Sequence, residues 1–65
     1  MSKIGKNLKK LREQKSISQD RLSKQADISL NTIAKLELEE NPNPTIETLQ
    51  KIAKALEVGV DDLIK

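Results

Sequence analysis

Apolar residues recur at helical spacing from the first residues of the chain. Ile4, Leu8 and Leu11 lie four and three residues apart, and lysines fill most of the positions between them. This spacing places the three side chains on one face of a helix, so residues 3–15 are predicted to form an amphipathic helix. Gly5 near its start is a small local cost that the first turn of a helix tolerates.

The stretch over residues 18–38 contains two shorter periodic runs. Leu22 and Ala26 lie four apart on one helical face, whereas Ile33 and Leu36 lie three apart on another. The pattern therefore predicts two short helices joined by a tight turn. The predicted helices span about residues 19–26 and 30–37, with Asp27-Ile28-Ser29 as the break. Ser18 and Ser29 are each placed as N-caps, where a side-chain oxygen accepts from an unpaired amide of the first turn.

Two Asn-Pro steps mark the segment 39–44, EENPNP, as a loop, because the residue before proline avoids the helical region. Thr45 then caps a helix over residues 46–56, which has apolar residues at helical spacing. A last short helix is predicted over residues 60–64, with Gly59 as its N-cap and acidic residues in its first turn. The prediction is an all-α fold of five short helices, forming one domain over residues 1–65.

The composition excludes several function classes. The 65 residues include no cysteine and no histidine, and this removes thiolate metal sites, the commonest metal ligand and the commonest general base. Enzyme chemistry and a cofactor are therefore not expected. Neither an 18-residue apolar run nor a signal-peptide pattern occurs, so we expect a cytoplasmic protein without a membrane partner.

The net charge of +2 is distributed unevenly along the chain. Residues 1–15 carry six basic side chains against Glu13 alone, whereas residues 37–65 carry seven acidic side chains against three lysines. A basic front and an acidic back would orient the domain toward a polyanion. Charge alone does not distinguish this interpretation from ordinary solvated helix faces.

Four segments, in this order, resemble the lambda-repressor-like, or Cro and XRE-type, helix-turn-helix DNA-binding domains. They are ISQDRLSKQADIS, NTIAKLE, NPTIETLQKIAKAL and VGVDDLI, and the similarity extends from Ile4 to Ile64. The resemblance implies a compact five-helix fold with the helix-turn-helix at the second and third helices. It also implies sequence-specific binding of double-stranded DNA by a transcriptional regulator or repressor, with the third helix in the major groove.

The resemblance also implies which residues contact DNA. Base edges would be contacted from the first two turns of the third helix, by Ser29, Leu30, Asn31, Thr32 and Lys35. Phosphates would be contacted by Ser18, Gln19, Asn41 and Asn43. The residue types suit these roles, because asparagine pairs with adenine, lysine donates to guanine, and leucine or threonine packs on a thymine methyl group.

Two of these assignments have a plain alternative. Leu30 could be a partly buried core residue, but the helix face defined by Ile33 and Leu36 does not include it, so we expect it to be exposed. Lys35 could be an ordinary solvated lysine. The carboxylates of Asp61 and Asp62 are interpreted as complementing a helix dipole rather than binding a metal.

The chain departs from the family at three positions where glycine is usual. These positions hold Ser16, Asp27 and Glu39, each beside or between helices where a positive φ angle is common. Glutamate is the least comfortable of the three in that conformation, so Glu39→Gly is expected to raise stability. Glu39 and Glu40 would also weaken binding, since they place negative charge where the family's loop meets DNA phosphates.

The departures leave a second function open, a protein-interaction module, antitoxin-like or a scaffold, on the same fold with weak or no DNA binding. The acidic residues at 37–40 and the leucines at 30 and 38 favour it. Nonspecific single-strand binding is poorly supported, because the chain has no aromatic residue on which bases could stack. A weak homodimer through the region of the last helix is also expected, with apolar surface from Val58, Val60, Leu63 or Ile64.

Overall fold

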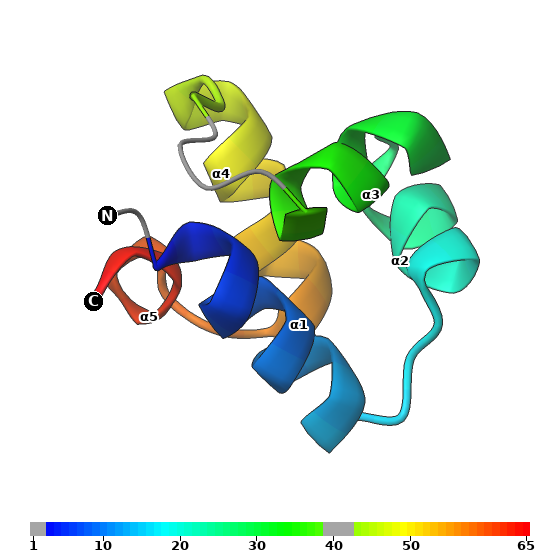
Figure 1. Ribbon diagram of the computed structural model, residues 1–65, viewed down its shortest axis with the longest axis horizontal. Coiled ribbons are helices and arrows are strands. Elements are labelled where there is room, and N and C mark those ends of the chain that lie inside the picture. The colour runs from blue at the N-terminus through cyan, green and yellow to red at the C-terminus, as the bar shows by residue number, and fades with distance from the viewer. Residues whose placement is uncertain (1–2, 39–42) are drawn as a thin grey trace.

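The computed structural model describes residues 3–38 and 43–65. Over these residues the chain forms five helices and no strand (Figure 1). They are α1 (Ile4–Gln14), α2 (Gln19–Ala26), α3 (Leu30–Leu38), α4 (Ile46–Leu56) and α5 (Val60–Ile64). The five predicted helices are confirmed, with α1 one residue shorter at each end. No helix of the described residues has the length and apolar character needed to cross a membrane.

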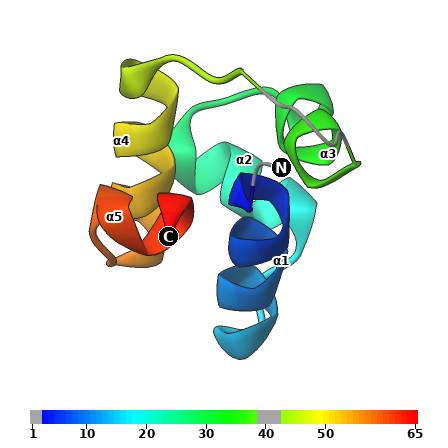
Figure 2. The same ribbon diagram turned by 60° about the vertical axis from the view of Figure 1, so that its left-hand side comes forward.

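The helices pack around one apolar core. Helix α1 packs on α3 and α5, α2 packs on α3 and α4, and α4 packs on α5. Figures 1 and 2 show α2 with α3 on one side of the molecule and α4 with α5 on the other. Six large side chains, drawn from all five helices, are at most 1% exposed: Leu8, Leu22, Ile33, Ile52, Leu56 and Leu63. The prediction that Leu63 offers exposed apolar surface is therefore wrong, because its side chain is needed in the core.

Hydroxyl side chains begin three of the helices, as predicted. In each case the oxygen accepts a hydrogen bond from the amide three residues later, at 3.0 to 3.1 Å. The pairs are Ser18 with Arg21, Ser29 with Thr32, and Thr45 with Thr48. Helix α5 begins differently, because the amide of Gly59 donates to the Asp62 carboxylate at 3.0 Å. These bonds satisfy amides that the helices leave unpaired.

Within the described residues, a left-handed residue that is not glycine follows the ends of three helices. Ser16, Asp27 and Glu57 have φ angles of 56°, 57° and 58°. The apolar residue after each one donates its amide to the carbonyl five positions earlier, at 2.9 to 3.0 Å, which closes the helix end. The conformation was expected at Ser16 and Asp27 but not at Glu57. Glu39, and with it the expectation for Glu39→Gly, lies outside the described residues.

Gly5 is buried where α1 crosses α3. A Cβ atom at this position would collide with the backbone oxygen of Leu36 and press on the backbone of Glu37. The residue is therefore more than a local cost to helix α1. It allows the backbones of α1 and α3 to approach more closely than any side chain permits.

Candidate nucleic-acid interface

The α2–turn–α3 unit has a buried inner side. Leu22 and Ala26 of α2 and Ile33 and Leu36 of α3 are between 0 and 5% exposed. The left-handed backbone of Asp27 ends α2 and redirects the chain into α3. Because the inner side is fixed in the core, the outer side of α3 is presented in a defined orientation.

The first two turns of α3 place a mixed set of side chains on this outer side. Asn31 and Lys35 are exposed, Thr32 is half-buried, and Leu30 is 44% exposed. The prediction that Leu30 is exposed is confirmed. The surface combines an amide, an ammonium group and two apolar groups. Amide and ammonium groups can hydrogen-bond to base edges in a major groove, and apolar groups can pack against a thymine methyl.

Ser29 and Thr32 are bonded to each other at the start of α3. The Thr32 amide donates to the Ser29 hydroxyl at 3.1 Å, and the two hydroxyl oxygens are 2.7 Å apart. Both hydroxyl groups therefore have a partner within the protein. Beside its hydroxyl group, Thr32 offers a methyl group.

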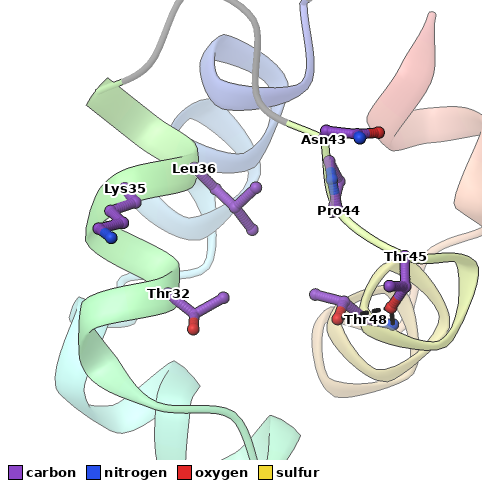
Figure 3. Close-up of a pocket in the computed structure, with 7 residues that line it drawn as sticks. All are labelled: Thr32, Lys35, Leu36, Asn43, Pro44, Thr45 and Thr48. Atoms are coloured by element: carbon purple, nitrogen blue, oxygen red, sulfur yellow. Dashed lines mark hydrogen bonds between the residues drawn. The ribbon is translucent and has the colours of Figure 1, made fainter.

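A shallow groove of about 270 Å³ separates α3 from the start of α4. It is lined by Thr32, Lys35, Leu36, Asn43, Pro44, Thr45 and Thr48. Figure 3 shows Thr32 and Leu36 extending from α3 toward Pro44 and Thr48 on the other side. The groove brings together Thr32, Lys35 and the exposed Asn43, three residues that the sequence assigned to the same site. Asn41 lies outside the described residues.

The two remaining phosphate candidates lie at the start of α2. Ser18 is exposed, and its hydroxyl already caps the helix through the Arg21 amide. Gln19 is half-buried, and its side-chain amide donates to Glu37 Oε1 at 3.0 Å. The amide of Gln19 is thus tied to the end of α3.

Glu37 also forms a buried ion pair with Arg12 of α1. Arg12 Nε lies 2.8 Å from Oε2 and Nη2 lies 3.1 Å from Oε1, while Nη1 donates to the Ile17 carbonyl at 2.8 Å. The Arg12 and Glu37 side chains are only 13% and 5% exposed. The hydrogen bond to Glu37 raises the pKa of Arg12 above its ordinary value, although burial acts the other way.

The uneven charge along the chain does not predict this pair, yet the positions of the two residues contain a signal for it. Arg12 follows Leu8 by four residues and Glu37 follows Ile33 by four, so each charge falls on the apolar face of its own helix. Two opposite charges on two inward faces predict a buried pair. Periodicity within one helix does not say which helices meet.

The lysines of the basic front have no ion-pair partner within the described residues. Lys3, Lys6, Lys9, Lys10 and Lys15 are all exposed. By contrast, three other lysines have a carboxylate within 4.0 Å. Lys24 and Lys51 pair with a residue of their own helix, and Lys65, just after α5, pairs with a residue of α5. Within the part of the chain that the structure describes, the charge of these five lysines is therefore not neutralised by an ion pair.

The chain is similar to a known protein family and to solved structures. The family model described as Helix-turn-helix matches residues 8–63. The N-terminal DNA binding domain of SinR from Bacillus subtilis is 30% identical, with a TM-score of 0.88 over 94% of this chain and 88% of that one. A comparison with curated proteins found no match.

Two further solved structures are similar over almost the whole chain. The master regulator for biofilm formation SinR, crystallised in complex with DNA, is 30% identical, with a TM-score of 0.87 over 92% of this chain and 95% of that one. The restriction-modification controller protein C.AhdI from Aeromonas hydrophila is 25% identical, with a TM-score of 0.88 over 97% and 94%. The likeness extends across all five helices.

Proposed function

The chain belongs to the Helix-turn-helix family, and we propose that it is a DNA-binding transcriptional regulator whose helix α3 enters the major groove of a duplex. One observation carries this proposal. The first two turns of α3 expose groups suited to base edges, while the opposite side of the same helix is held in the core. A rigid, outward-facing helix of this kind is what groove recognition requires.

The base contacts follow from the chemistry of the exposed side chains. Asn31 is suited to a paired hydrogen bond with adenine, and Lys35 to donation to guanine O6 and N7. Leu30 and the methyl group of Thr32 are suited to a thymine methyl, and Ser29 lies beside them. We assign these five residues to base contacts, with the SinR–DNA complex as support for DNA as the partner.

The phosphate contacts lie on two sides of α3. Ser18 and Gln19 stand at the start of α2, where unpaired amides also favour an anion. Asn43 stands across the groove from Thr32 and Lys35. Asn41 is proposed as a phosphate contact on the sequence resemblance alone. The exposed lysines among residues 3–15, which have no ion-pair partner within the described residues, would add a long-range attraction to the polyanion.

A weak homodimer on DNA is part of the proposal. A single domain makes few base contacts, so two copies on half-sites about 34 Å apart would supply the specificity. The apolar surface would come from the α5 region, where Ile64 is 53% exposed and Val58 and Val60 are half-buried.

Regulation of transcription in the cytoplasm, without a cofactor and without catalysis, completes the proposed role.

Selection from a random duplex pool, with affinity measured across salt, tests the proposal. We expect an enriched motif, in two spaced copies if a dimer binds, and a log affinity that falls linearly with log salt. An affinity independent of salt would refute DNA binding and leave the protein-interaction module. A salt-dependent affinity without enrichment would leave nonspecific binding only.

Two alanine variants separate base contacts from phosphate contacts. Asn31→Ala is expected to relax the preference at one base position, by about 1–3 kcal/mol of discrimination. Gln19→Ala is expected to weaken all duplexes alike. Equal effects of the two variants across sequences would contradict recognition by α3.

A further inference from the structure

Glu37 is a buried carboxylate that receives donors from two other helices. Its oxygens accept two hydrogen bonds from Arg12 of α1, at 2.8 and 3.1 Å, and one from Gln19 of α2, at 3.0 Å. The side chain of Glu37 is 5% exposed. One residue at the end of α3 thus connects α1, α2 and α3.

The bond from Gln19 is not needed to balance the charge of Glu37. Arg12 already bonds both carboxylate oxygens in the two-pronged geometry that guanidinium groups favour. The effect of the third hydrogen bond is therefore to restrict the side chain of Gln19. A free glutamine side chain has several rotamers, and fixing it on binding costs up to about 2 kcal/mol.

Gln19 has hydrogen-bonding capacity left after this contact. A side-chain amide carries two N–H donors and one acceptor oxygen, and Glu37 occupies one donor. Gln19 is also the first residue of α2, where the positive end of the helix attracts an anion. An amide held in one orientation at this place offers its second N–H to a phosphate oxygen without further ordering.

We propose that Glu37 is a positioning residue for DNA binding: it fixes the side-chain amide of Gln19 for a backbone phosphate, while Arg12 neutralises the carboxylate. The inference rests on the proposed function. The neutralisation matters because an unpaired carboxylate beside the start of α2 would repel the phosphate that Gln19 binds. Neither Glu37 nor Arg12 has to touch the nucleic acid for this role.

A double-mutant cycle tests the coupling. Removing one partner of a buried pair threatens folding, so the pair is replaced as a whole by Arg12→Met/Glu37→Met, which often leaves stability little changed. Gln19→Ala is then made in the wild-type and in this pair-replaced background. Circular dichroism and urea melts establish that each protein is folded, and affinity for one selected duplex is measured at fixed salt.

Gln19→Ala is expected to weaken binding about tenfold in the wild-type background, as for one hydrogen bond to a charged group. In the pair-replaced background the same change is expected to weaken binding less than about twofold. An equal loss in both backgrounds, or no loss in the wild type, would overturn the inference. Failure of the wild type to bind any duplex in a salt-dependent manner would instead overturn the proposed function.

Gln25→Ala is the matched control, because Gln25 is an exposed glutamine of the same helix. We expect its effect on affinity to stay below about twofold in both backgrounds, because residues without shared partners have independent effects. If Gln25→Ala also responded to the background, the pair would act on α2 as a whole, and the specific role of Gln19 would be refuted.

A second measurement avoids substitutions of the buried pair. Nitrogen-15 relaxation of the Gln19 side-chain amide in the free wild-type protein is expected to give an order parameter above about 0.6, on a scale where rigid backbone gives about 0.85. The value should change little when the duplex is added. A value below about 0.6 in the free protein would overturn the inference, because the amide would then be ordered by DNA rather than by Glu37.

Discussion

The α1–α3 junction and the α4–α5 corner are held by different kinds of contact. At the junction, Gly5 lets two helix backbones approach closely, and Arg12 and Glu37 form a buried ion pair. At the corner, α4 packs on α5, and Leu56 and Leu63 are both fully buried in the core. Apolar packing tolerates changes of partner, whereas a buried charge and a close backbone approach each depend on one particular partner.

Removal of Glu37 gives the largest expected effect in this comparison. Glu37→Ala leaves the Arg12 guanidinium buried without its partner, and we expect a loss of about 3–5 kcal/mol in the free energy of unfolding. Urea melts followed by circular dichroism measure it. The control is Glu47→Ala on α4, which removes an exposed ion pair with Lys51 and should lose at most about 1 kcal/mol.

The two results together test the comparison. If Glu37→Ala and Glu47→Ala lost similar amounts, the ion pair would not hold the α1–α3 junction. The pair would then have no more structural weight than a surface bridge, and only its proposed role toward Gln19 would remain.

Addition of one methyl group at the junction gives the next effect. Helix propensity alone predicts that Gly5→Ala stabilises α1 by about 0.5–1 kcal/mol. Because the new Cβ would collide with the backbone of α3, we expect destabilisation by about 1–3 kcal/mol instead. A gain in stability in urea melts would show that α1 and α3 separate easily. Lys6→Ala, in the same turn but exposed, is the control and should be nearly neutral.

The sequence predicted the parts of the molecule that depend on neighbours along the chain. Helix positions, the hydroxyl caps and the exposure of Leu30 all follow from spacing within about one or two helical turns. The role of Gly5 and the Arg12–Glu37 pair were missed, since their partners lie on another helix and Arg12 and Glu37 are 25 residues apart. Spacing along one helix fixes an inward direction but not the helix that it meets.

In the candidate site, too, the sequence indicated some features and missed one that depends on how two helices pack. The resemblance placed Thr32, Lys35 and Asn43 in one site, and the structure arranges them around one groove. It did not indicate that Gln19 is bonded to Glu37, because this contact depends on how α2 packs beside α3. Direct contact with DNA remains a proposal for each of these residues.

The smallest expected effect concerns the left-handed turns, which occur on both sides of the molecule. Glu57 ends α4 at the corner and Asp27 ends α2 beside the interface, with φ angles that agree within one degree. Glutamate gains nothing locally from this conformation, whereas the short side chain of aspartate tolerates it. We therefore expect Glu57→Gly to raise the free energy of unfolding by about 0.5–1 kcal/mol, and Asp27→Gly by less. Paired urea melts decide the order. A larger gain at Asp27 would place the greater backbone strain beside α3, and the turn before α3 would then be the more strained of the two turns.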